Sequence, residues 1–551
     1  MSYGSRDESN LKIRGFRKDT SLILIDGRPL CSGYFGNVDL SKILSEDIDE
    51  IRIIKGPASA MYGGGSMGGV VNIITHSRDH ILSLEAELSR NLRNRQRLSS
   101  AQNFGDWGYR VSLGREERSA PPLSKLFEPT LFETGGVRDH SYQKSWSTRA
   151  GLDFIIASLH EMGLSGGYKY IPYKEIPSSI YTRDYRVYRD WYMADAALIW
   201  DHYTTLNSNL RGQIYLDATG DTFERYSDSH HQYLQLSSRM EAYNLGFAPS
   251  FEYRAGDVIT TGFRLEHRNI RRKDDGFYED WTMNDAFVGN AFGQYQKELM
   301  ERAILNLSIG VTGFSHSKNR DLKLIAEPSA GVSWDHPDES ESMVSLGINS
   351  ALPTMRQLFS ADHGNPDLVA ARAFKSEISH NRSISVWGQR TAIVGGSLYY
   401  NDVRDLIDLN GQRYANVYKV QSYGTELSGS MMVSPYWELS GQYAYLKQLG
   451  NYVLTESAPH SVDIQSRMRF PDYLDLSASY SWRSIRKSQD SSSTLHSLPA
   501  HDTVELGISR TFSNLELALS MQNAFDRDYQ SEYGYPAPGR DFRLKIKYSF
   551  R

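Results

Sequence analysis

The sequence predicts an all-β membrane protein, a 22-stranded antiparallel transmembrane β-barrel preceded by a shorter Gly-rich segment. No run of 18 apolar residues occurs in the 551 residues and the mean hydropathy is −0.50, which excludes helical membrane spans. From residue 81 onward, segments of ~10 residues alternate in polarity, as barrel strands do, and about 22 of them can be counted. Tyrosine is unusually common, 35 against 21 Phe and 9 Trp, and its amphipathic ring suits membrane interfaces.

The N-terminal segment is organised around two predicted strands on either side of a glycine-rich stretch. Residues 51–55 alternate in polarity, Gly56-Pro57 interrupts them, and five glycines lie between Gly63 and Gly69. Val70 to Thr75 is apolar and β-branched, which favours a second strand. The glycines indicate either positive φ angles or backbone packed where no side chain fits.

Three catalytic or nucleotide-binding readings of these glycines are disfavoured. Gly63 to Gly68 contains both G-x-G-x-x-G and G-x-S-x-G, but a dinucleotide loop and a nucleophile elbow each lead into a helix. Residues 70–75 are a poor helix start, and no Lys-Ser/Thr pair follows for a phosphate loop. Ser66 has no adjacent His, so no catalytic set is expected.

Several linked motifs identify a family. IRGF (13–16), LILIDGRPL (22–30) and DLSKILSEDIDEIRIIKGPASAMYGGGSMGGVVNIIT (39–75) resemble the plug domain of TonB-dependent outer-membrane receptors. LPTMRQLF (352–359) with GNPDL (364–368) resembles their mid-barrel signature, and FRLKIKYSF (542–550) resembles their closing strand, except that Arg551 follows the aromatic. The resemblance implies a plug inside the barrel lumen and a location in the bacterial outer membrane.

The resemblance also sets expectations for the domains. It begins within the plug, and residues 1–10 contain no secretory signal. We therefore expect a truncated or misannotated start, with a partial plug at 1–76, a linker over 76–80 and the barrel at 81–551. If the coupling segment (the TonB box) is missing, a passive, non-coupled barrel is the alternative to an active transporter.

Hairpins and loops are predicted from the turn pattern. Short turns join 248–254 to 258–265, 503–511 to 515–522, and Val386 to Ile393 across Gly388-Gln389. Longer polar stretches, predicted to be loops at the other end, are 120–142, 170–188, 221–238, 273–285, 350–372 and 487–501. No repeat of 40 to 50 residues supports a propeller.

The resemblance implies a receptor that captures a scarce nutrient and admits it by remodelling the plug, without enzymatic chemistry. A ferric siderophore is the expected ligand, with cobalamin or haem as alternatives; His363 would be the axial ligand of haem. No cofactor and no resident metal are expected, because His230-His231 and Asp274-Asp275 read as solvated loop residues. The net charge of −5 gives no basic face for nucleic acid, and the single Cys31 forms no internal disulfide.

Candidate ligand contacts come from two regions. By the layout of the family, 28–37 and 59–67 are plug apices. The barrel segment 170–192 combines tyrosines with basic residues that suit an anionic aromatic ligand. The alternatives are packing against the wall and an interfacial girdle. The candidates are Arg28, Tyr34, Phe35, Met61 and Tyr62 on the plug, and Tyr181, Arg183, Tyr185 and Arg186 in the barrel loops.

The expected partners follow from the same resemblance. They are the small-molecule ligand, outer-membrane lipid, a TonB-type energy-coupling protein, and the barrel-assembly machinery, which would read the aromatic near the C-terminus. Nucleic acid is not an expected partner.

Overall fold

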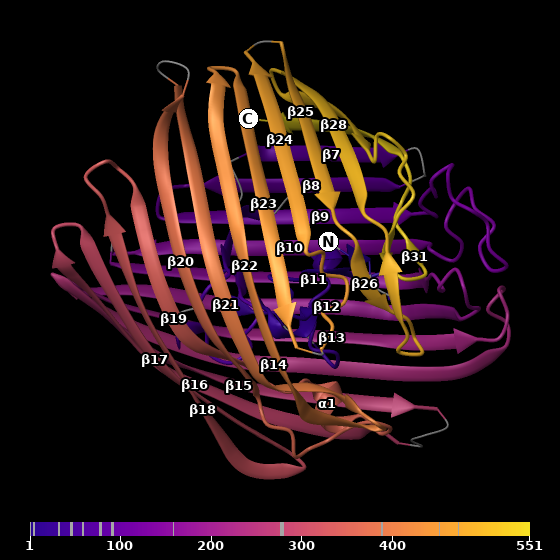
Figure 1. The fold of residues 1–551 in the computed structure, drawn as a ribbon, viewed down its shortest axis with the longest axis horizontal. Coiled ribbons are helices and arrows are strands. Elements are labelled where there is room, and N and C mark those ends of the chain that lie inside the picture. Colours follow the sequence, from indigo (N-terminus) through magenta and orange to yellow (C-terminus); the bar gives the residue numbers. More distant parts are fainter. Residues whose placement is uncertain are drawn as a thin grey trace.

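The computed structural model describes residues 2–3, 6–30, 33–43, 48–57, 60–75, 80–89, 93–157, 159–275, 280–386, 390–450, 452–471 and 473–550. Twenty-two strands pair antiparallel into one closed barrel, which confirms the predicted fold class. The barrel closes where the last strand, β32 (Asp541–Phe550), pairs with the first, β7 (His80–Ser89), in the register Leu544↔Leu88. Opposite walls cross steeply in Figure 1, as tilted strands of a closed barrel do.

The remaining barrel strands follow one another around the wall in chain order. They are β8 (Asn94–Asn103), β9 (Trp107–Arg118), β10 (Gln143–Ile156), β11 (His160–Ile176), β12 (Tyr185–Thr205), β13 (Ser208–Tyr226), β14 (Leu234–Ala255), β15 (Asp257–Asp274), β16 (Thr282–Met300), β17 (Ala303–His316), β18 (Asn319–Asp335), β19 (Glu341–Ala351), β20 (Ala371–Val386), β21 (Arg390–Asn410), β22 (Arg413–Ser434), β23 (Trp437–Leu449), β24 (His460–Phe470), β25 (Leu474–Arg483), β28 (His501–Phe512) and β29 (Leu515–Gln522). Within the described ranges, no helix is long and apolar enough to span a membrane.

The longer connections all lie at one end of the barrel, which also has the two-residue turns 317–318 and 411–412, and the other end has short turns. The predicted hairpins β14–β15 and β28–β29 form as expected, and so do β20 and β21. The turn 388–389 of the last hairpin lies outside the described residues, as do Cys31, Ser59 and 76–79. At the long-loop end, 119–142 is a loop as predicted, and the loop 484–500 contains the hairpin β26 (Arg486–Gln489) and β27 (Leu495–Leu498).

The prediction of a loop over 170–188 is wrong for most of that segment, which belongs to two strands. β11 continues to Ile176 and β12 begins at Tyr185, so the connection is only 177–184. The loop predicted over 221–238 likewise shrinks to 227–233. The physical reason is strand length: β12 has 21 residues, whereas crossing the bilayer needs about 10, so these strands continue beyond the membrane with polar and aromatic residues that resemble a loop composition.

The plug is a four-stranded sheet within the lumen, drawn in indigo between the walls in Figure 1. Its order is β4 (Arg28–Pro29), β3 (Leu22–Ile25), β6 (Val70–Thr75) and β5 (Ile48–Ile54), with β3 parallel to β6. The apolar faces of β3 and β6 form a core with Ile13 and Leu30. Smaller elements are β1 (Ser2–Tyr3), β2 (Ser9–Asn10) and the 3-10 turns η1 (Lys18–Thr20), η2 (Leu40–Lys42) and η4 (Ala60–Tyr62).

The glycine-rich stretch is required by close backbone packing. Gly69 has a φ of 120°, and a Cβ there would lie 2.7 Å from the carbonyl oxygen of Ile54. Gly63 has a φ of 60°, and its Cβ would lie 2.7 Å from the Asn290 side chain of the barrel wall. Both glycine explanations from the sequence therefore hold, because positive φ and lack of space occur at the same residues.

Candidate functional site: the plug apices and the outer loops

Arg28 joins the plug to the barrel wall at mid-height. Its Nη2 donates to Asp195 Oδ2 on β12 at 2.5 Å, and its Nη1 donates to Asp217 Oδ1 on β13 at 2.7 Å. The Arg28 side chain has no exposed surface, and each carboxylate side chain is 2% exposed. Arg28 therefore packs against the barrel wall in a buried ion-pair triad, which was the alternative to a ligand contact. As a ligand contact, Arg28 stays a prediction.

A second ion-pair network fixes the plug to another part of the wall, formed by β20 and β22. Arg14 Nη2 lies 2.7 Å from Glu377 Oε1 and 3.1 Å from Glu426 Oε2, and Lys55 Nζ also lies 3.1 Å from Glu426 Oε2. Nearby, Lys375 Nζ donates to the carbonyl oxygens of residues 55 and 56. Sequence reasoning missed this function, although the IRGF motif contains Arg14 and the mid-barrel signature ends at Glu377.

The upper plug apex carries Tyr34 and Phe35 beneath a folded barrel loop. The loop 352–370 contains the helix α1 (Met355–Phe359), whose Met355, Leu358 and Phe359 pack around the buried Tyr34. The Arg356 backbone N–H donates to the Tyr34 carbonyl oxygen at 2.8 Å. At Gly36, with a φ of 77°, a side chain would collide with Thr354. This apex and the loop above it therefore pack closely against each other.

Three guanidinium groups lie over the two apical rings. The Cζ of Arg6 is 3.3 Å and that of Arg356 is 5.5 Å from the Phe35 ring centroid, and the Cζ of Arg272 is 4.9 Å from the Tyr34 centroid. Arg272 is paired with Asp274 at 2.8 Å. Among the described residues, Arg6 and Arg356 have no carboxylate within ion-pair distance. Within the described ranges, the apex therefore carries two guanidinium groups that have no ion-pair partner.

The second apex lies at mid-height against β16 and β17. Met61 is 39% exposed, so its thioether is accessible to solvent. Tyr62 packs on Leu24 and Val70, and its carbonyl oxygen accepts a hydrogen bond of 2.8 Å from Arg264 Nη2. Burial raises the pKa of the Tyr62 phenol. The Tyr62 ring thus packs against the plug core, and as ligand contacts both Met61 and Tyr62 stay predictions.

Of the four candidates predicted in the loops, Tyr185 and Arg186 belong to the start of β12, and all but Arg186 contact a neighbouring outer loop. Tyr181 stacks on Tyr533 at 4.8 Å, and the Cζ of Arg183 is 5.4 Å from the Phe132 centroid. The remaining contacts are Tyr185 with His140, at 5.1 Å between ring centroids, and Arg186 Nε with Asp184 Oδ2 at 3.1 Å. The loops 119–142, 177–184 and 523–540 thus form one interlocked outer cluster, and as ligand contacts these four residues stay a prediction.

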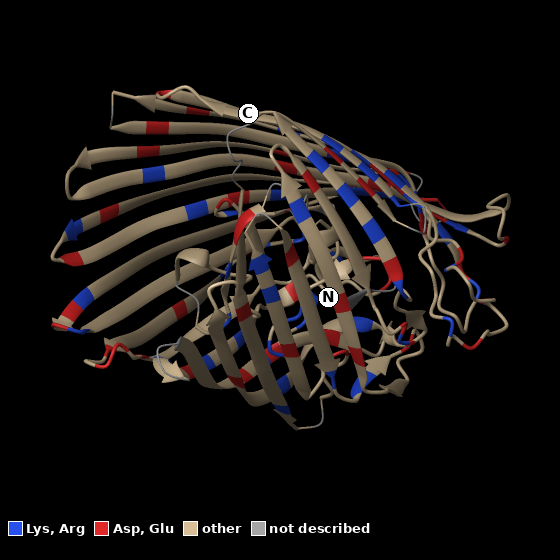
Figure 2. Cartoon of the chain, turned by 90° about the horizontal axis from the view of Figure 1, so that it is seen from above, with Lys and Arg blue, Asp and Glu red and all other residues tan. Residues whose placement is uncertain are grey.

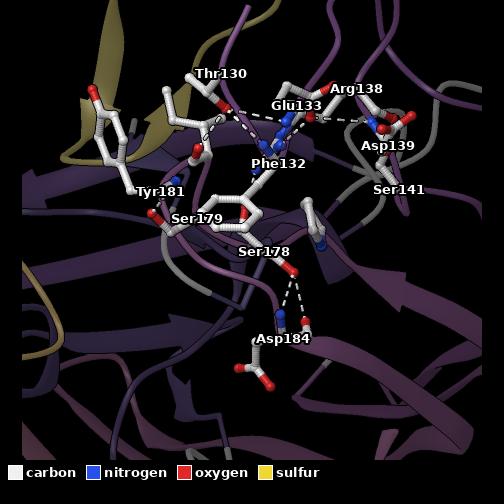
Figure 3. A network of polar contacts seen from close by, with 12 residues as sticks. Thr130, Phe132, Glu133, Arg138, Asp139, Ser141, Ser178, Ser179, Tyr181 and Asp184 are labelled. Atoms are coloured by element: carbon white, nitrogen blue, oxygen red, sulfur yellow. Dashed lines mark hydrogen bonds and ion pairs between the residues drawn. The ribbon is translucent and has the colours of Figure 1, made fainter. Parts of the chain in front are cut away.

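Polar contacts reinforce this cluster (Figure 3). Thr130 Oγ1 donates to the Ile180 carbonyl oxygen at 2.6 Å, and Arg138 bridges the buried Glu133 carboxylate and the Ser178 carbonyl oxygen. Ser178 Oγ donates to the Asp184 carbonyl oxygen at 2.6 Å. No function was predicted for the loop 119–142. Its hydrogen bonds hold the neighbouring connection 177–184 in place.

His363 lies at the junction of two outer connections. Its Nδ1 lies 2.8 Å from the Gln412 carbonyl oxygen, to which the protonated nitrogen donates. The haem alternative assigned to His363 stays a prediction. In the described ranges, no three His, Cys, Asp or Glu side chains gather in a way that would hold a metal ion.

Beside the plug, a cavity of about 520 Å³ separates its N-terminal segment from β7–β9 and β32. Its lining carries both signs of charge: Arg118 pairs with Asp7, Lys545 Nζ lies 3.3 Å from Glu85 Oε2, and Arg93 Nε lies 3.0 Å from Glu116 Oε1. Figure 2 shows the same mixture, with Lys and Arg next to Asp and Glu on neighbouring strands. The gap beside the plug is polar but has no dominant charge.

The chain matches two sequence families. Residues 1–70 match the TonB-dependent receptor plug domain, and residues 79–524 match the TonB-dependent receptor-like β-barrel. The plug match begins at residue 1, and a truncation within the plug is not evident from it.

Solved structures share the fold at low sequence identity. The FrpB iron transporter from Neisseria meningitidis (F3-3 variant) is 14% identical with a TM-score of 0.81, covering 99% of this chain and 96% of that chain. The copper transporter OprC is 16% identical with a TM-score of 0.84, covering 100% and 94%. A mutant of the ferric enterobactin receptor PfeA from Pseudomonas aeruginosa is 16% identical with a TM-score of 0.77, covering 100% and 93%. With its plug, its closed barrel of 22 strands and both family matches, the chain belongs to the TonB-dependent receptors of the Gram-negative outer membrane.

Proposed function

We propose that this receptor actively imports an anionic ferric siderophore. The family binds small-molecule ligands of the siderophore type and interacts with TonB. The choice of ligand rests on two guanidinium groups, those of Arg6 and Arg356. Both lie over the ring of Phe35, and neither has an ion-pair partner within the described ranges. An anionic aromatic chelate would stack on the ring and accept charge-assisted hydrogen bonds from both cations.

Ligand binding at this apex has a direct route into the plug. The Arg356 N–H to Tyr34 carbonyl bond couples loop 352–370 to the plug backbone, so a ligand that moves Arg356 also moves Tyr34. Below it, the ion pairs of Arg28 and Arg14 hold the plug in the wall. Breaking a buried ion pair costs about 3–5 kcal/mol, so opening requires work supplied from outside the barrel. Energy coupling by TonB supplies that work.

Ligand titration on the purified receptor tests the proposal. The probes are a ferric tris-catecholate, which is anionic, and cyanocobalamin, which represents the alternative ligand. The double variant Arg6→Ala/Arg356→Ala should weaken ferric catecholate binding about tenfold or more, because two charge-assisted contacts are lost. Arg52→Ala is the matched control, since Arg52 is exposed on the edge strand β5 and pairs with Glu50. Tight binding of cyanocobalamin, or unchanged catecholate binding by the double variant, would contradict the proposal.

A further inference from the structure

Two histidines from different outer loops meet above the barrel. His140 belongs to loop 119–142 and His231 to loop 227–233, and their ring centroids are 5.6 Å apart with the ring planes at 76°. Both residues have positive φ angles, 48° and 54°, which non-glycine residues rarely adopt. Such backbone conformations persist where the surroundings impose them, and here they bring two imidazoles together.

One imidazole nitrogen of this pair is left without a partner. The His231 Nε2 is buried and forms no hydrogen bond within the described structure. Most buried polar atoms in native proteins are paired, and an ion or an ordered water can supply a missing partner. His230, the neighbour in sequence, is instead exposed on the turn organised by Asp228.

The surroundings of His231 favour a lone pair on this nitrogen. The Tyr173 hydroxyl lies 3.4 Å from His231 Nδ1 and 3.3 Å from Glu175 Oε1. A phenol has one proton, and when it donates that proton to the carboxylate it can only accept from the imidazole. Nδ1 then carries the ring proton and Nε2 is unprotonated, the tautomer that binds metals through Nε2.

The spacing of the rings fits a shared ion. With metal–nitrogen distances of about 2.0–2.1 Å, each ring centroid lies about 3.2 Å from the ion. Two such rings at an angle of about 120° at the metal have centroids about 5.5 Å apart, close to the observed 5.6 Å. The stacked pair His160–His202 is different, because its rings lie face to face at 4.2 Å and 1° and cannot direct two lone pairs at one ion.

We propose that His140 and His231 bind a divalent transition-metal ion of the Cu²⁺ or Zn²⁺ class, which links loop 119–142 to loop 227–233. Imidazole ligands suit these ions. Two protein ligands leave the other coordination positions to water. The site does not depend on the siderophore proposal, because it lies among the loops rather than at the plug apex.

Metal titration of the full chain, purified in detergent without a polyhistidine tag and stripped with a chelator, tests this site. We expect saturable binding of one Cu²⁺ per chain, with electron paramagnetic resonance showing two nitrogen ligands. His140→Ala and His231→Ala should each weaken binding at least tenfold and leave one nitrogen, whereas His230→Ala should change nothing. Tyr173→Phe should weaken binding about tenfold but keep both nitrogens, since it acts only through His231.

The proposal is overturned by either of two results: no saturable binding by the wild type, or wild-type affinity in both His140→Ala and His231→Ala. Circular dichroism of each variant confirms that the barrel has folded before binding is compared. Failure here leaves the ferric siderophore proposal untouched, because that proposal is read from catecholate binding to Arg6 and Arg356.

Discussion

Replacing Arg28 by Met should loosen the plug without affecting the barrel. The guanidinium sits between two carboxylates that are each 2% exposed, at 2.5 Å and 2.7 Å. Asp195 keeps a second cation, because Arg149 Nη2 lies 3.1 Å from its Oδ1. Asp217 loses the one cation that the described structure gives it. Leaving a buried carboxylate uncompensated costs about 3–5 kcal/mol, so Arg28→Met should lower plug stability by that amount.

A Ser66→Cys substitution in a Cys31→Ser background provides the assay, because Ser66 is fully buried within the plug. The rate of thiol labelling at this position in increasing urea reports opening of the plug, while circular dichroism reports the barrel. Arg28→Met should shift plug opening to lower urea, and adding Asp217→Asn should restore most of the loss by removing the buried charge. An unchanged labelling profile in Arg28→Met, or no recovery in the double variant, would refute the triad as a stabilising contact.

Three further outcomes are expected. Arg14→Ala should also lower plug stability, by about 2–4 kcal/mol, because it leaves two partly buried glutamates without their shared cation; equal labelling of variant and wild type in urea would count against this. Burial raises the pKa of the Glu456 carboxyl, but Lys12, whose Nζ lies 2.5 Å from Glu456 Oε2, lowers it by more. The net effect is a pKa below the ordinary carboxyl value. This contribution to stability is present above the ordinary carboxyl pKa and is lost as pH falls through the depressed one, so plug opening should become easier in acid and Glu456→Gln should flatten that dependence. Tyr62→Ala should lower plug stability by about 2–4 kcal/mol with the circular dichroism of the barrel unchanged, since its ring packs in the plug core; weaker ligand binding with full stability would instead make it a ligand contact.

The barrel was predictable because its determinants are local. Alternating polarity sets the inward and outward faces of each strand, and turns such as Gly256-Asp257 and Ser513-Asn514 mark hairpins within a few residues. The glycine-rich plug stretch was predictable for the same reason, since a run such as 63–69 has few structural explanations. The strand ends were predicted less well, because polarity alone does not show where a strand leaves the membrane, as at β11 and β12.

The site could be predicted only in part, because its contacts join residues far apart in sequence. Arg28 and Asp217 are separated by 189 positions, and no local pattern records that they meet. The same holds for His140, which pairs with His231 rather than with a histidine nearer in sequence. Composition drew attention to Tyr181 as an aromatic residue among basic ones, but its stacking on Tyr533 depends on how the loops pack.

The central claim is that a ferric siderophore meets the plug apex and is imported with energy supplied through TonB. The most direct measurement is uptake of radioactive iron as ferric catecholate by cells that lack other catecholate receptors and express this receptor from its native gene. We predict uptake in cells with TonB, none in cells without it, and a reduction of about tenfold in the Arg6→Ala/Arg356→Ala variant. Uptake that persists without TonB, or that the double variant leaves unchanged while the protein is present at wild-type level in the outer membrane, would contradict the account.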